Sequence, residues 1–364
     1  MDNLFSFLLG FTLSQAMKCR MKNAFVYHED FNKYDLGTDH PLIGDKPRNA
    51  LAYLKTKGLL SQFDVLTPEA CTYQDLQRAH TDEYLKHIKY LSENGGYLSM
   101  DTPAPKGIFE IASLAAGGSI MAAEKVFDGY QLAINPLGGF HHACRASSSG
   151  FCFFNDIAVA IEHIRHAHRL KRFLIIDIDV HHGNGTQDIY YEDPTVLNIS
   201  LHQDGRTLYP GTGDVDAIGR DAGEGFTVNL PLPPGTSTKS YLKAFHDIVP
   251  PLAMQFSPQV VVFQSGVDTH HADPLADLSI PLQTYTLLAS QVAKLSKDTC
   301  NKLVVLFGGG YNSESCIQAY GNEVSGLLGG DALVREPEPV DADPNAVETM
   351  LADLKIRLAD FWEL

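Results

Sequence analysis

The chain is poor in cysteine, tryptophan and positive charge. Its 364 residues include six cysteines and one tryptophan, and 28 lysines and arginines face 44 aspartates and glutamates, so the net charge is −16. No two cysteines form a C-x-x-C pair, which argues against a disulfide framework and against a cysteine zinc site. The acidic balance disfavours direct binding to nucleic acid or to an anionic membrane. It leaves open a cationic partner, such as a basic peptide or a polyamine, and it is equally typical of a cytoplasmic protein with an acidic, solubilising surface.

The chain also lacks a hydrophobic run of membrane-spanning length. Residues 4–13 are largely apolar, but a transmembrane helix needs about 20 such residues. Asp2 precedes this run and no basic residue does, whereas a secretory signal begins with positive charge. We expect residues 1–20 to be a leader of uncertain role, either a packed helix or the product of a start upstream of Met21. Residues 21–364 are expected to form one domain.

Apolar runs alternate with helical patterns along the rest of the chain, and 44% of the residues are hydrophobic, which excludes wholesale disorder. Residues 173–177 and 260–264 are nearly continuously apolar, the pattern of strands buried on both faces of a parallel sheet. This alternation predicts one large α/β domain. The expected strands are 24–27, 132–135, 173–177, 196–201, 226–230, 260–264 and 303–307, and the expected helices are 107–129, 156–170, 238–256 and 282–298.

Two features are expected after the last strand. Residues 335–344 are acidic and contain prolines, and we interpret them as solvated surface. Apolar residues at helical spacing between 347 and 361 predict a closing helix that packs on the domain.

Polar side chains follow four of the expected strands. In open α/β sheets, ligands bind beyond the carboxyl ends of the strands, so these side chains are expected to meet. Asp177, Asp179 and His181 alternate along an extended chain and would point to one side. A divalent metal held by Asp179 and His181, with Asp268 from a later strand, would offset the charge of the two carboxylates. The alternative is that these are solvated loop residues.

A histidine pair and a tyrosine complete the candidate site. His141 and His142 follow a glycine turn, and adjacent imidazoles can act as proton donor and acceptor once carboxylate or amide partners fix their tautomers. Tyr311 follows three glycines, where its phenol could donate a hydrogen bond to a developing oxyanion. Asp273 belongs to a loop in the same region and could simply cap a turn.

Together these motifs resemble the zinc-dependent histone deacetylase family, which includes bacterial deacetylases and acetylpolyamine amidohydrolases. The resemblance runs from about residue 24 to residue 362 and implies an arginase-like α/β fold with an eight-stranded, mostly parallel sheet between helices. The motifs that carry it are residues 139–143 (GFHHA), 150–156 (GFCFFND), 177–185 (DIDVHHGNG), 209–213 (YPGTG), 266–268 (GVD), 273–278 (DPLADL) and 308–311 (GGGY).

The resemblance implies a role for each matching residue. Asp179, His181 and Asp268 match ligands of Zn²⁺, with Fe²⁺ as an alternative occupant. His142 matches the general base and acid, His141 its neighbour, and Tyr311 the tyrosine of the transition state. The carboxylate that orients His141 corresponds to Asp177. The backbone carbonyls of Asp177, Asp179 and His181, with Ser200 and Leu201, match a structural K⁺ site.

The implied substrate is an acetylated amine, most simply acetyl-lysine in a protein or peptide. Phe151, with Gly150 before it, and Tyr209 match the walls of an acyl-lysine tunnel. Leu275 lies near its rim, and Asp101 matches an aspartate that holds the substrate backbone. Small acylated amines such as acetylpolyamines remain an alternative substrate class. The oligomeric state is not implied.

Two departures from the family pattern matter. Asn184 stands where some members have an aspartate beside the second histidine, and an uncharged amide should make His142 harder to protonate. Residues 40–48 lack the usual charge spacing after His-Pro, which affects rim contacts.

Two rival functions are weaker. A two-manganese hydrolase of the arginase type needs more ligands than Asp268 followed by Thr269 supplies. A silent acyl-lysine binding module would be expected to have lost a ligand, a histidine or the tyrosine, and all are present.

Overall fold

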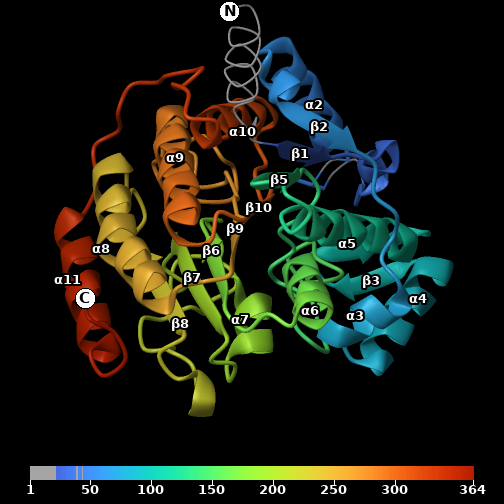
Figure 1. Ribbon diagram of the computed structural model, residues 1–364, viewed down its shortest axis with the longest axis horizontal. Helices are drawn as coiled ribbons and strands as arrows, with labels where there is room; N and C mark the ends of the chain where they lie inside the picture. The colour runs from blue at the N-terminus through green and yellow to red at the C-terminus, as the bar shows by residue number, and fades with distance from the viewer. Residues whose placement is uncertain (1–21, 38–39, 43) are drawn as a thin grey trace, which may run out of the picture.

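An eight-stranded parallel sheet organises the chain (Figure 1), with strand order β2-β1-β5-β10-β9-β6-β7-β8. The computed structural model describes residues 22–37, 40–42 and 44–364, so the leader expected at residues 1–20 lies outside the described residues. Within those described ranges, no helix is both long and apolar enough to cross a membrane. The eight-stranded parallel sheet confirms the α/β fold expected from the sequence.

The elements have the following bounds. The strands are β1 Asn23–Val26, β2 Phe63–Leu66, β3 Gly96–Ser99, β4 Thr102–Ala104, β5 Leu132–Asn135, β6 Phe173–Asp177, β7 Val196–Gln203, β8 Thr227–Leu232, β9 Val260–Gln264 and β10 Leu303–Leu306. The helices are α2 Lys46–Thr56, α3 Tyr73–Ala79, α4 Asp82–Asn94, α5 Ile108–Lys125, α6 Asp156–His168, α7 Asn184–Tyr190, α8 Thr238–Phe256, α9 Leu282–Thr299, α10 Ser313–Leu327 and α11 Pro344–Leu358. Short 3-10 helices span Glu29–Lys33, Leu59–Gln62 and Asp221–Gly223.

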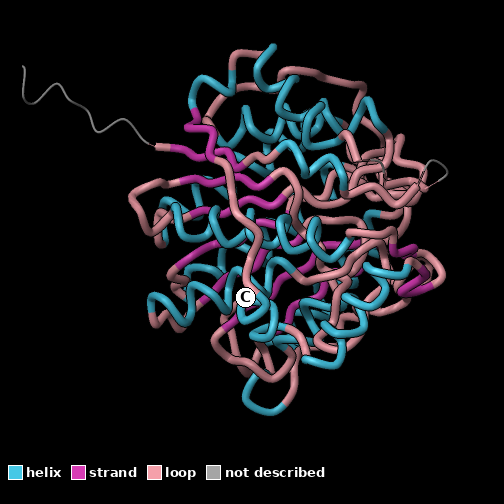
Figure 2. The backbone as a smooth tube through the Cα atoms, turned by 90° about the vertical axis from the view of Figure 1, so that its right-hand side faces the viewer, coloured by secondary structure: helices cyan, strands magenta, loops and turns pink. Residues whose placement is uncertain are grey.

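Each central strand is buried on both faces because helices cover both sides of the sheet. In β6, Leu174 and Ile176 pack into one hydrophobic core, whereas Phe173 and Ile175 pack into the other. The first core lies under α8, α9, α10 and α11, and the second lies under α3, α4, α5 and α6. Figure 1 shows α8, α9 and α11 on one side of the sheet and α5 and α6 on the other. Figure 2 shows the strands stacked one above another with helices around them.

Agreement with the expected elements is closest in these doubly buried segments. The bounds of β5, β6, β9 and α8 match the expected ranges, and the closing helix is α11. The sequence reasoning did not anticipate the edge strand β2, in which Asp64 and Val65 are exposed, or the small antiparallel hairpin of β3 and β4. Neither has the continuous apolar pattern that identifies a central strand.

The acidic segment at residues 335–344 is more than solvated surface. The carboxylate of Asp341 accepts the backbone N–H groups of Ser237 (2.5 Å) and Ser240 (3.3 Å) at the start of α8. Glu336 accepts the N–H of Leu282 (2.8 Å), the first residue of α9. Helix N-termini leave N–H donors without partners and favour negative charge. The segment therefore caps two helices that are distant from it in sequence, and we call residues 335–343 the capping segment.

Candidate active site

The register of the parallel strands brings the candidate loops to one edge of the sheet. Asn135 pairs with Leu306, Leu306 with Gln264, Gln264 with Asp177, and Asp177 with Ser200. These five residues form one row across β5, β10, β9, β6 and β7. The loops that follow these strands therefore start side by side, as predicted for the carboxyl edge of the sheet.

The three expected metal ligands meet just beyond this row. Asp179, His181 and Asp268 are all buried, and their candidate ligand atoms lie within 4.8 Å of one another. Nδ1 of His181 lies 3.2 Å from Oδ1 of Asp179 and 3.2 Å from Oδ2 of Asp268. The other oxygen of Asp179 accepts the backbone N–H of Gly309 (2.8 Å), and the other oxygen of Asp268 accepts that of Val180 (2.8 Å). One nitrogen and two oxygens thus converge on one point.

The ionisation of this cluster is compatible with a bound cation. Burial, together with Asp179, raises the pKa of Asp268 to about 7. Burial opposes charge on His181 as well, but its hydrogen bonds to the two carboxylates outweigh burial and raise its pKa to about 10. A proton on the His181 imidazole thus offsets the negative charge of the two carboxylates. A divalent metal could offset the same charge instead. Three nitrogen and oxygen donors around a buried centre fit the ligand set of a catalytic zinc site.

Glycines make room for the two carboxylates. A Cβ on Gly266 would lie 2.2 Å from Oδ2 of Asp179, and a Cβ on Gly309 would lie 2.1 Å from Oδ2 of Asp268. Both distances are far below van der Waals contact, so no larger residue fits without moving a candidate ligand. At Gly309, one of the three glycines before Tyr311, the backbone thus approaches Asp268 closely.

Each histidine of the pair has its own hydrogen-bond partner, a carboxylate for His141 and an amide for His142. Nδ1 of His141 lies 2.7 Å from Asp177 Oδ2, and Nδ1 of His142 lies 2.7 Å from Asn184 Oδ1. Burial opposes charge on His141, but Asp177 and Asp179 outweigh it and raise its pKa to about 9. Burial, with the neighbouring rings of His141 and His181, holds the pKa of His142 well below its usual value.

These shifts assign different protonation states to the two rings. His141 carries charge and His142 is neutral. Because the amide oxygen of Asn184 can only accept a hydrogen bond, the proton of the neutral His142 ring sits on Nδ1. Nε2 of His142 is left as an acceptor, and the charged His141 donates to it from Nε2 over 3.2 Å.

Aromatic rings enclose the space above these groups. The ring of Tyr209 lies 5.2 Å from that of His142, and the ring of Phe151 lies 5.6 Å from that of Tyr311, measured between centroids. One cavity is lined by Phe151, both histidines of the pair, Asp179 and Tyr311. The tunnel walls expected from the sequence therefore lie over the candidate centre.

Gly150 allows the backbone next to Phe151 to lie close to the ring of His142. It has φ +60°, and a Cβ there would lie 2.3 Å from Cδ2 of His142. Its N–H donates to Oδ2 of Asp101 (3.0 Å), and the other oxygen of Asp101 accepts from Ser99 (2.5 Å) and Thr102 (2.9 Å). The carboxylate of Asp101, which was expected at the rim, thus holds the backbone of Gly150 next to Phe151.

Asp273 joins two loops of the site. Its carboxylate accepts the N–H of Tyr311 (2.7 Å) and the N–H of Leu275 (3.0 Å). Asp273 therefore does more than cap a turn, the role considered from the sequence. Its carboxylate connects the backbone of Tyr311 to that of Leu275, a half-buried residue expected at the rim.

Comparison with known proteins agrees with this geometry. The family model described as "Histone deacetylase domain" matches residues 40–327. A histone deacetylase-like amidohydrolase from Pseudomonas aeruginosa is 39% identical over 308 residues, covering 82% of this chain and 79% of the relative. A probable deacetylase from Archaeoglobus fulgidus is 33% identical over 327 residues, covering 87% and 90%. The crystal structure of an HDA15 HD domain has a TM-score of 0.83 at 30% identity, covering 94% of this chain and 96% of that one.

The chain belongs to the histone deacetylase family. Family membership makes it a deacetylase of the amide hydrolase class, as the motifs indicated.

One residue of this deacetylase site was missed by sequence reasoning. Gln264 ends β9, and its Nε2 lies 3.2 Å from Asp179 Oδ2, 3.2 Å from the carbonyl of Gly139 and 3.4 Å from Nδ1 of His141. In the sequence, Gln264 marks only the end of an apolar strand. The available signal was a buried polar residue at the carboxyl end of a central strand, because such groups need partners.

The residues of the expected potassium site lie on adjacent strands of the deacetylase. Asp177 is opposite Ser200 in the register of β6 and β7, and the loop with Asp179 and His181 follows directly. The hydroxyl of Ser200 pairs with His202 Nδ1 at 2.8 Å, and the carbonyl of Leu201 accepts a long bond (3.4 Å) from Tyr241.

Proposed function

We propose that this deacetylase is a zinc-dependent hydrolase that removes the acetyl group from the side-chain amine of lysine in proteins or peptides and releases acetate. The observation that carries the proposal is the placement of His142, whose Nδ1 is held by Asn184 and which lines the same cavity as Asp179 of the buried Asp179–His181–Asp268 cluster. Tyr311 lines that cavity too. A base, a metal ligand set and a proton donor around one space are what amide hydrolysis requires.

A metal bound by Asp179, His181 and Asp268 would polarise the acetyl carbonyl and increase the acidity of the attacking water. Nε2 of His142 takes the proton of that water and returns a proton to the leaving amine. His141 stays charged beside Asp177 and disfavours a second positive charge on its neighbour.

The Tyr311 phenol acts as a hydrogen-bond donor throughout. Burial, together with Asp268 and Asp179, raises its pKa well above the usual value, so the hydroxyl keeps its proton. It can donate this hydrogen to the carbonyl oxygen as negative charge develops there.

The donor set supports Zn²⁺, with Fe²⁺ as the alternative, because both accept one imidazole and two carboxylates. We also propose a structural K⁺ held by the backbone of Asp177, Asp179 and His181 with Ser200 and Leu201. Carbonyl oxygens and a hydroxyl are suitable ligands for such a hard monovalent ion.

The rim favours a peptide substrate. The β3–β4 hairpin places the fully exposed side chain of Met100 directly before Asp101, and Tyr97 is 70% exposed on the same hairpin. Such an apolar surface can contact residues next to the acetyl-lysine. Asp101 accepts three hydrogen bonds within the chain, and a carboxylate has about four acceptor sites, so it can still bind a substrate N–H.

Acetylpolyamines are the second candidate, because the net charge of −16 favours a cationic amine. The same acidity is the basis on which we propose a cytoplasmic location and no direct contact with nucleic acid or membrane.

The test is a substrate panel of acetyl-lysine peptides, longer acyl-lysine peptides and acetylpolyamines, each assayed with metal-loaded protein and after chelation. We expect acetate release from the acetyl-lysine peptides, lost on chelation and restored by Zn²⁺. Activity on acetylpolyamines alone would contradict the lysine assignment. Binding of acetyl-lysine peptides without turnover by metal-loaded protein would instead support a silent binding module.

A further inference from the structure

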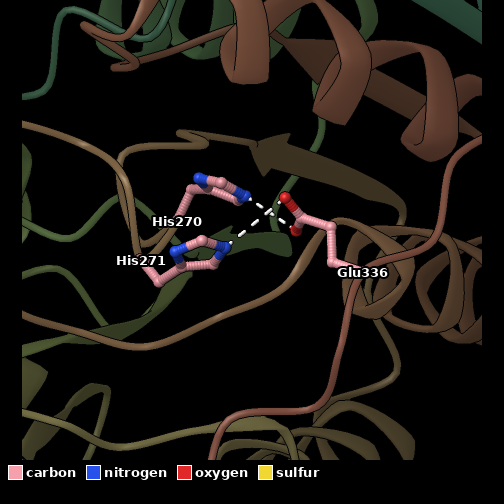
Figure 3. A group of neighbouring side chains, drawn as sticks. All are labelled: His270, His271 and Glu336. Carbon is pink, nitrogen blue, oxygen red and sulfur yellow. Dashed lines mark hydrogen bonds and ion pairs between the residues drawn. The ribbon is translucent and has the colours of Figure 1, made fainter.

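We propose a second divalent metal site, formed by His270, His271 and Glu336, outside the catalytic centre (Figure 3). Nε2 of His270 lies 2.9 Å from Oε2 of Glu336, and Nε2 of His271 lies 3.4 Å from Oε1 of the same carboxylate. The candidate ligand atoms of the three residues lie within 4.8 Å of one another. Figure 3 shows both imidazoles directed at the carboxylate.

The carboxylate is held in place independently of the histidines. The side-chain amide of Gln283 accepts the backbone N–H of Glu336 (3.0 Å) and donates to its backbone carbonyl (3.0 Å). Oε2 of Glu336 accepts the N–H of Leu282 (2.8 Å). Metal sites are strongest when such outer contacts fix the ligands in advance. Oε1, whose only described contact is His271, is the oxygen available to an ion.

Two imidazoles and one carboxylate form a ligand set suited to Zn²⁺, with water completing the coordination. Tetrahedral zinc with bonds of about 2.0–2.1 Å separates its ligand atoms by about 3.3 Å, close to the 3.4 Å between Nε2 of His271 and Oε1 of Glu336. His270 is buried, but the side chain of His271 is 39% exposed, so an ion can enter from solvent.

The protonation of His270 determines how the ion would bind. Its Nδ1 accepts the N–H of Ala272 over 3.2 Å, so in the metal-free ring Nε2 carries the proton and donates it to Glu336. An ion at Nε2 displaces this proton to Nδ1, and the contact with Ala272 is lost. We therefore expect weaker binding here than at the Asp179–His181–Asp268 cluster.

The position of the site gives it a structural consequence. His270 lies two residues after Asp268 and three before Asp273, whose carboxylate holds Tyr311. Glu336 belongs to the capping segment. An ion would thus cross-link the capping segment to the loop that supplies one of the candidate catalytic ligands.

The test compares Zn²⁺ binding by the full chain and by the variants His271→Ala and Glu336→Gln. His246→Ala, at an exposed histidine on α8, is the matched control. Bound zinc is measured by equilibrium dialysis followed by metal analysis. The wild type and the control are expected to bind one Zn²⁺ more than His271→Ala, in which affinity at this site falls by at least about 10-fold. Excess Zn²⁺ should raise the melting temperature of the wild type and the control by more than that of His271→Ala, in which only the catalytic cluster can still bind the ion.

The readout is a difference between variants, so it does not depend on whether the catalytic cluster binds metal. Glu336→Gln guards against a folding artefact, because the glutamine oxygen can still accept the Leu282 N–H while the carboxylate is gone. Equal zinc binding by the wild type and both variants would overturn the proposal and leave His270 and Glu336 as a hydrogen-bonded clip.

Discussion

Nδ1 of His142 lies 2.7 Å from the amide oxygen of Asn184, the first residue of α7. This contact fixes the tautomer of the proposed base without adding charge to its environment. Burial and two neighbouring imidazoles already hold the pKa of His142 well below its usual value. The ring is thus neutral and ready to accept a proton over a wide pH range.

Replacing this partner with a charged one should alter the pH dependence. In Asn184→Asp, a carboxylate would stabilise the protonated form of His142 and raise its pKa by about one unit or more. Because the base must be neutral, the acidic limb of the kcat/KM profile should move to higher pH by the same amount. Asn184→Ala, which removes the tautomer partner, should lower activity without that upward shift. An unchanged acidic limb in Asn184→Asp would show that His142 is not the base.

Tyr311→Phe removes only the phenolic hydroxyl. Because we assign this hydroxyl to the developing oxyanion, kcat should fall by about 10²–10³ with little change in KM. The backbone bond from Tyr311 to Asp273 remains, so the melting temperature should stay close to that of the wild type. Steady-state kinetics on an acetyl-lysine peptide measures the effect, and near-normal turnover would remove Tyr311 from the mechanism.

Gly150→Ala tests the close approach of the tunnel wall to the base. The added Cβ would lie 2.3 Å from Cδ2 of His142 at φ +60°, so the ring must move. A displacement near 1 Å can lower kcat/KM by about 10². Gly58→Ala is the matched control, since Gly58 has φ +74° and no atom within 4 Å of the new Cβ. Both variants should lose about 1–3 kcal/mol of stability from the backbone, but only Gly150→Ala should lose activity to this extent.

Glu323 can be used to measure how ionising a buried carboxyl away from the reacting groups affects the stability of the fold. Neither of its carboxylate oxygens has a hydrogen-bond partner among the described residues, and burial raises its pKa to about 8. Because the folded-state pKa is above the ordinary value of 4.5, the carboxyl is most compatible with folding at low pH. Its contribution to stability is lost as the pH rises from about 4.5 through 8.

Glu323→Gln should therefore be more stable than the wild type above pH 8, by on the order of 2–4 kcal/mol, and nearly equal to it below pH 5. Urea unfolding across this pH range measures the difference. A constant difference between the two proteins at all pH values would show that the pKa of Glu323 is the same in the folded and the unfolded chain.

The catalytic edge of the fold was predictable because it depends on local pattern. Continuous apolar runs such as residues 173–177 identify doubly buried strands, and polar residues directly after them fall at the carboxyl edge. The convergence of Asp179, His181 and Asp268 was expected on this basis, and the structure brings them together.

Contacts between distant segments were not predictable in the same way. No spacing in the sequence indicates that Gln264 faces Asp179, or that Asp341 caps α8 from about 100 residues away. The acidic capping segment has the composition of solvated surface, and only its packing gives it a structural role. Asp101 was expected at the rim as a residue that holds the substrate, and its bond to the backbone of Gly150 could not be foreseen.

The sequence alone thus determined the fold class, the family and the set of reactive side chains, because hydrophobic periodicity and short motifs are local properties of the chain. The family resemblance named Asp177 and Asn184 as neighbours of the histidine pair, but only the tertiary structure decided the protonation state of each ring. The neutral state of His142 follows from burial and from the rings of His141 and His181, and the charged state of His141 follows from Asp177 and Asp179, which outweigh its burial. Desolvation and charge act through distance in space, and distance in space is set by packing.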